Sequence, residues 1–231
     1  RATGETELYV DVNAVMPAVP AGRPYAGSPA AGPDPHPQTP GGNWFNDVRD
    51  PADTSIDSWA ASHRGVAKIG LGDVEISADG TQLYTVNLAT AELYTIDLVA
   101  GDPITTPAEA SRIAADPIPT EQCAADSDAM AFGLSIHDGE LFVGVTCTGE
   151  STGSASDVSF HIYTYDPARA VPWEHEVEVP WTATNPSWSS FAWKDWDSSW
   201  IGDGGSGHPA LPSTDTGEGI TFLLEGQRYL S

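Results

Sequence analysis

An Asp-Gly pair between two runs of alternating apolar and polar residues occurs twice in this chain. Residues 74–87 contain the pair at Asp79, and residues 132–143 contain it at Asp138. Asp-Gly in such a setting is the strongest short-range signal of a β-hairpin, because both residues tolerate the positive φ angles of a tight turn. The two hairpins constrain the fold more than any other feature, and they predict an all-β protein.

A third strand follows each hairpin, at residues 92–98 and 161–166, and each carries a tyrosine at its third position. The second copy of the whole unit follows the first by about 60 to 70 positions, a spacing typical of repeated β-propeller blades. We therefore predict antiparallel meanders of the blade type over residues 66–112 and 128–185.

Fragments of the same unit are predicted near both ends of the sequence. Residues 1–12 predict a partial blade with a third strand at residues 7–12, and residues 217–231 predict another partial blade. Residues 16–42 are rich in Pro, Gly and Ala and predict a long surface loop. Because a propeller needs about four blades or more, we expect residues 1–231 to form one incomplete propeller, completed by further chain or a protein partner. A compact β-sandwich is the alternative.

Acidic residues dominate the charge, with 33 Asp and Glu against 9 Lys and Arg and a formal net charge of −24. This balance argues against binding to nucleic acid and to anionic membrane surfaces, because both require basic patches. No apolar run reaches the length of a membrane span. The acidity fits either a solvated, self-repelling surface, as in halophile proteins, or calcium coordination in acidic loops.

The chain contains two cysteines, Cys123 and Cys147. An even number of cysteines in a chain of this type predicts a disulfide, and a disulfide indicates an extracellular or cell-surface location. A pair of buried free thiols is the alternative.

Four carboxylates are the predicted metal ligands. Asp73 and Glu75 lie two positions apart on a predicted first strand, and Asp126 and Asp128 precede the corresponding strand of the next unit. If these strands line a channel, carboxylates from several blades would converge on a hard cation such as Ca²⁺, the one cofactor that the sequence suggests. The alternative is that these residues cap turns and accept backbone hydrogen bonds.

Six tryptophans lie between residues 173 and 200. Exposed aromatic side chains mark interfaces and can stack on sugar rings, so Trp188, Trp193, Trp196 and Trp200 are predicted to bind a glycan or a protein. The alternative is core packing between blades, where aromatic side chains bury large areas.

Two histidines in loops, His36 and His208, are further candidates for a ligand or a general base. A solvated loop histidine is the alternative for both. The sequence holds neither a Gly-x-Ser-x-Gly elbow nor a His-Glu-x-x-His motif, so we predict no catalytic residue.

Several of these segments together resemble a propeller-like domain of large bacterial surface proteins, often found ahead of SdrD B-like modules. The segments that carry the resemblance are 34–37, Trp44, Asp47, 66–88 and 132–150. The resemblance implies an extracellular or cell-surface propeller with an adhesion or wall-associated role, and it implies no catalytic residues.

Three functions remain open at this point. The first is an extracellular or cell-surface β-propeller module, not an enzyme, with an adhesion, assembly or structural binding role. Its partner would be another protein or the rest of a longer chain. The second is a metal-dependent hydrolase or lactonase of the propeller type, with its metal in the channel. The third is a carbohydrate-binding module that uses the tryptophans between residues 173 and 200.

Overall fold

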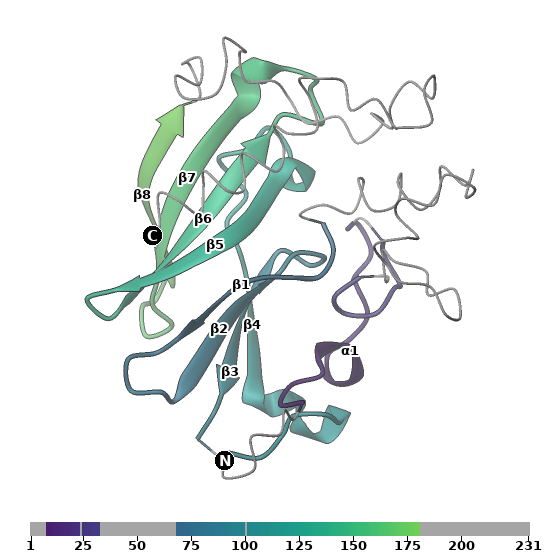
Figure 1. Ribbon diagram of the computed structural model, residues 1–231. Helices are drawn as coiled ribbons and strands as arrows, with labels where there is room; N and C mark the ends of the chain where they lie inside the picture. Colours follow the sequence, from purple (N-terminus) through teal and green to yellow (C-terminus); the bar gives the residue numbers. More distant parts are fainter. Residues whose placement is uncertain (1–7, 24, 33–67, 100, 181–231) are drawn as a thin grey trace, which may run out of the picture.

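The computed structural model describes residues 8–23, 25–32, 68–99 and 101–180 (Figure 1). In this part of the chain, eight strands form two four-stranded antiparallel sheets, each with its strands side by side in sequence order. The first sheet contains β1 (Leu71–Ile76), β2 (Gln82–Asn87), β3 (Glu92–Asp97) and β4 (Ile113–Pro117). The second sheet contains β5 (Ala129–His137), β6 (Glu140–Thr148), β7 (Val158–Tyr165) and β8 (Trp173–Pro180). The described residues also form short helices: α1 (Val12–Val15), η1 (Pro107–Arg112), η2 (Asp126–Asp128) and η3 (Ala155–Asp157). The mostly β architecture predicted from the sequence is confirmed.

Both predicted hairpins form. Between β5 and β6, Asp138 and Gly139 have φ angles of 51° and 88°, which is the type I′ geometry of a two-residue hairpin loop. Between β1 and β2, Gly80 has a φ angle of 70°, and the Oδ1 atom of Asp79 accepts a hydrogen bond from the backbone N–H of Thr81 at 3.0 Å. The turn residues therefore act through local backbone geometry, as the sequence indicates.

The pairing register shows that the two sheets repeat one unit. In the first sheet Thr85 of β2 lies opposite Tyr94 of β3, and in the second Val143 of β6 lies opposite Tyr163 of β7. Both first strands also carry a register shift at the same place, one just before Val74 and the other just before Leu134. The two third-strand tyrosines thus occupy equivalent positions.

The first sheet is longer than predicted. The predicted limits of 66–112 end before β4, which adds a fourth strand up to Pro117. The sequence of β4, Ile-Ala-Ala-Asp-Pro, contains one large apolar side chain and therefore lacks the alternation that indicates a strand. The second sheet lies within its predicted limits of 128–185 and also has a fourth strand, β8.

The strand predicted at residues 7–12 is wrong for the residues that the structure describes. Val10 makes only an isolated parallel bridge with Ile104, and the chain then enters α1. Asp11 explains the difference, because its Oδ1 atom accepts a hydrogen bond from the N–H of Ala14 at 3.1 Å and so caps the helix. Residues 16–23 and 25–32 form turns and bends, as expected for the predicted loop. The predicted partial blade at 217–231 lies outside the described residues.

Opposite faces of the two sheets meet. The core between them contains side chains from both sheets: Val86, Leu88, Leu93, Leu134, Leu141, Val143, Val145, Tyr163 and Tyr165. The other face of the first sheet packs against the N-terminal segment through a second cluster: Val12, Val15, Ala30, Tyr94, Ile96, Ile104 and Ile113. Tyr94 and Tyr163 are equivalent in register, but Tyr94 faces away from the second sheet whereas Tyr163 faces the first. One face of the first sheet therefore packs against the opposite face of the second, an arrangement that we call head-to-tail stacking.

The first strands of the two sheets approach each other most closely (Figure 1). A Cβ atom on Gly72 of β1 would lie 3.0 Å from the backbone oxygen of Phe132 in β5, so a larger residue here would push the two strands slightly apart. At the other side of the interface, the hydroxyl of Tyr165 in β7 donates a hydrogen bond of 2.6 Å to Asp116 Oδ2 in β4. The two described sheets form no closed ring.

Candidate functional site

Asp73 of β1, a predicted metal ligand, links β1 to β5 by a hydrogen bond. Its Oδ1 atom accepts a hydrogen bond from the N–H of Val74 at 2.9 Å, and its Oδ2 atom accepts one from the N–H of Leu134 at 3.2 Å. The register shift before Val74 interrupts the strand alternation at Asp73, which allows its carboxylate to reach β5. The carboxylate therefore stabilises the contact between the sheets by accepting backbone hydrogen bonds.

The two predicted ligands before β5 also accept hydrogen bonds from nearby groups. Asp128 is only 1% exposed, and its two oxygens accept hydrogen bonds from the N–H and the hydroxyl of Ser151 at 2.9 and 2.6 Å. Asp126 accepts a hydrogen bond from the hydroxyl of Thr120 at 2.6 Å. In the described ranges, no three His, Cys, Asp or Glu side chains are placed to hold a metal ion together. The calcium site at Asp73, Glu75, Asp126 and Asp128 stays a prediction.

The predicted disulfide between Cys123 and Cys147 is present, with a Cα–Cα distance of 5.2 Å. Cys147 lies in β6 and is fully buried, whereas Cys123 lies in the segment that leads from β4 to η2. The bond therefore fixes this connection against the second sheet. A closed loop of 24 residues stabilises the folded state by about 3 kcal/mol in the chain-entropy model.

A pair of histidines on β7 and β8 is the most distinctive polar group of the described residues. Alternation along β7 places Ser159, His161 and Tyr163 on one face, and β8 brings His175 beside them. The Nε2 atom of His161 lies 2.8 Å from the hydroxyl oxygen of Ser159, and its Nδ1 atom lies 3.1 Å from the Nε2 atom of His175. A register shift between Ile162 and Tyr163 allows this diagonal contact. Ser159, His161 and His175 therefore form one continuous chain of hydrogen bonds.

The surroundings of His161 favour its uncharged imidazole. His161 is 1% exposed, and burial and then the neighbouring His175 lower its pKa, against the opposing effect of Glu178 and Glu121. The ring of Tyr163 lies 5.0 Å from that of His175, and burial raises the pKa of this tyrosine to about 12. At neutral pH both groups are therefore uncharged.

Sequence reasoning did not single out His161 or His175, because they lie 14 positions apart and match no short motif. The one signal in the sequence is the period of two, which places His161 and His175 each two positions from an aromatic residue of its own strand. Only the pairing of β7 with β8 brings the two imidazoles together.

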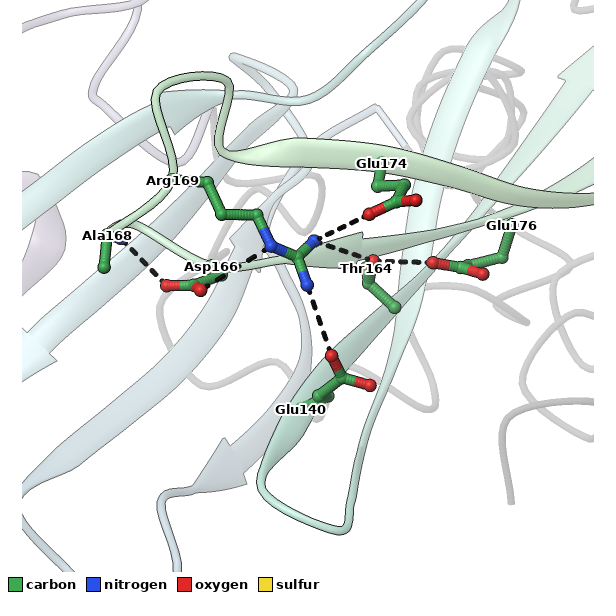
Figure 2. Close-up of polar contacts among 7 residues, drawn as sticks. All are labelled: Glu140, Thr164, Asp166, Ala168, Arg169, Glu174 and Glu176. Carbon is green, nitrogen blue, oxygen red and sulfur yellow. Dashed lines mark hydrogen bonds and ion pairs between the residues drawn. The ribbon is translucent and has the colours of Figure 1, made fainter.

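A second polar group lies at the end of the second sheet (Figure 2). The guanidinium of Arg169 forms ion pairs with Glu140 at 3.2 Å, Glu174 at 3.2 Å and Asp166 at 3.6 Å, and thereby links β6 to β8. These carboxylates are about half exposed or more, so each pair contributes at most about 1 kcal/mol. Each of these three carboxylates is paired with the guanidinium of Arg169. We therefore assign the cluster a role in stabilising the second sheet.

The remaining predicted binding residues lie outside the part of the chain that the structure describes. They are His36, Trp188, Trp193, Trp196, Trp200 and His208. Of the tryptophans between residues 173 and 200, Trp173 is described, and it packs on Tyr165 with ring centroids 4.7 Å apart. This contact joins paired residues of β7 and β8 within the second sheet, and Trp173 also packs against the core between the sheets.

Comparisons with protein-family models, curated proteins and solved structures find no match. In the described residues, no helix is long and apolar enough to cross a membrane.

Proposed function

We propose that this chain supplies blades to an extracellular or cell-surface β-propeller module whose role is assembly or adhesion. The observation that carries the proposal is the head-to-tail stacking of two sheets with the same register. Blades of a propeller are related by rotation, so the same face of every blade meets the opposite face of its neighbour. Two halves of a sandwich have no such requirement, because each sheet needs only one buried face.

Exposed apolar residues on the first strand support an assembly role. Val74 and Ile76 of β1 are 50% and 53% exposed, whereas the equivalent Leu134 of β5 is 3% exposed because the first sheet covers it. The N-terminal segment packs on the same face of the first sheet but leaves Val74 and Ile76 about half exposed. A further blade would bury Val74 and Ile76 as the first sheet buries Leu134, with a gain of about 1 kcal/mol for each side chain.

The disulfide and the acidic surface support the location. A disulfide persists in oxidising compartments, and a net charge of −24 keeps a secreted module soluble and disfavours contact with anionic surfaces. The hydrolase hypothesis has no such support, since the described residues provide no cluster of three metal-binding side chains. The glycan hypothesis depends on tryptophans outside those residues.

The test is the mass of the native particle, measured by mass spectrometry under non-denaturing conditions. We expect a mass well above 24.3 kDa, from a second polypeptide or from a longer form of this chain. Where the added mass is a second polypeptide, a double variant, Val74→Ser with Ile76→Ser, should lose it while keeping its own fold. Val177→Ser is the matched control, because Val177 is also an exposed valine but lies on β8. A native species of 24.3 kDa would contradict completion by further blades.

A further inference from the structure

His161 and His175 are placed as two ligands of one metal ion. They come from neighbouring strands, and the ring nitrogens that face each other are 3.1 Å apart. Ligand nitrogens lie about 2.1 Å from a bound transition metal, so one ion at this distance from both would have an N–metal–N angle of about 95°. That angle fits two adjacent positions of an octahedral or square-planar site. It is narrower than the tetrahedral angle that zinc prefers.

Ser159 prepares His161 for this role. If the hydroxyl oxygen of Ser159 accepts the Nε2 proton of His161 across their 2.8 Å contact, the lone pair remains on Nδ1, which is the atom that faces His175. Metal-binding histidines commonly donate their second ring N–H to such a partner, which fixes the tautomer and the ring orientation.

The pair combines a fixed ligand with an accessible one. His161 is fully buried, whereas His175 is exposed and can turn so that both lone pairs point to one ion. Water would complete the coordination of a divalent ion, since no third His, Cys, Asp or Glu side chain of the described residues is placed to share it.

We propose that His161 and His175 form a binding site for a divalent transition metal ion, of the type of Ni²⁺ or Cu²⁺. Imidazole nitrogen suits these ions, and an adjacent pair of nitrogens suits their tetragonal and octahedral geometries. The site is different from the predicted calcium site, since Ca²⁺ takes oxygen ligands and the carboxylates of that prediction lie on and before the first strands. The alternative is a hydrogen bond between the two imidazoles with no metal function.

The experiment measures binding of Ni²⁺ and Cu²⁺ to the whole disulfide-bonded chain by isothermal titration calorimetry, together with the metal-induced rise in Tm. We expect one equivalent of metal to bind and to raise Tm, because a ligand of the folded state stabilises it. His175→Gln should weaken binding by at least about 10-fold, and Ser159→Ala by about 10-fold through the orientation of His161. His137→Gln is the matched control, since His137 is an exposed strand residue at a hairpin turn, and it should bind as the wild type does.

A spectroscopic readout keeps the test independent of folding effects. The electron paramagnetic resonance spectrum of bound Cu²⁺ should show coupling to two imidazole nitrogens in the wild type and to one in His175→Gln. Since His175 is exposed, this variant is expected to fold even if His161→Gln does not. Equal affinity of the wild type and His175→Gln, or no binding of either ion at about millimolar concentration, would overturn the proposal and leave the hydrogen bond as the explanation.

Discussion

The head-to-tail packing makes a quantitative prediction at two positions that are equivalent in register. Leu134 of β5 is buried between the sheets, and Val74 of β1 is half exposed. Leu134→Ala removes three buried carbon groups, each contributing about 0.8 kcal/mol, and leaves a cavity, so the free energy of unfolding should fall by about 3 kcal/mol. Val74→Ala removes two carbon groups that are about half exposed, and it should cost about 0.8 kcal/mol.

Urea denaturation followed by far-UV circular dichroism measures both changes. With an m-value of about 2 kcal/mol/M, the midpoint should fall by about 1.5 M for Leu134→Ala and by less than about 0.5 M for Val74→Ala. Val177→Ala of β8 is the control for loss of an exposed valine from a strand, and it should behave as Val74→Ala does. Equal midpoints for Leu134→Ala and Val74→Ala would show that the sheets do not pack in this way, and would refute the reasoning.

Three further predictions concern the disulfide, one hydrogen bond and one histidine. Replacing Cys123 and Cys147 together by serine should cost about 3 kcal/mol in the same assay, and a reducing agent should lower Tm in the wild type but not in the variant. Tyr165→Phe should cost about 2 kcal/mol, because its hydroxyl donates to the carboxylate of Asp116 and links the sheets; an unchanged midpoint would contradict this. The lowered pKa of His161 means that the unfolded chain binds a proton at this site more readily than the folded one. This contribution to stability is therefore complete above the unfolded pKa of about 6.5 and is lost as the pH falls below it. Between about pH 7.5 and about pH 5.5, the free energy of unfolding should thus fall more for the metal-free wild type than for His161→Gln. Parallel curves of unfolding free energy against pH for the two proteins would exclude this contribution of His161.

Features encoded by a few adjacent residues were predicted well from the sequence. The Asp-Gly turns depend on positive φ angles, at Gly80 in the first and at Asp138 and Gly139 in the second, so a short motif is enough to indicate them. The third strands and their equivalent tyrosines, Tyr94 and Tyr163, also follow from local alternation. The strand predicted at residues 7–12 failed because alternation there competes with the helix cap at Asp11, and a strand without a paired neighbour gains no stability.

Features that depend on distant residues were not visible in the sequence. Strand β4 forms because the backbone of residues 113–117 pairs with the free edge of β3, although the sequence of these residues favours no strand. The sequence did not indicate that the carboxylate of Asp73 accepts a hydrogen bond from the N–H of Leu134 in β5, 61 positions away. The pairing of His161 with His175 likewise follows from a register shift in β7 and β8.

The sequence by itself determined the β class, the two hairpins, the repeat of one unit and the acidic surface, because turn chemistry, alternation and charge are properties of neighbouring residues. The tertiary structure decided which faces are buried, which strand closes each sheet and which polar side chains meet. These outcomes depend on pairing and packing between segments far apart in the chain. A hydrogen bond or an apolar contact between such segments stabilises the fold only after the intervening chain has lost the entropy of loop closure.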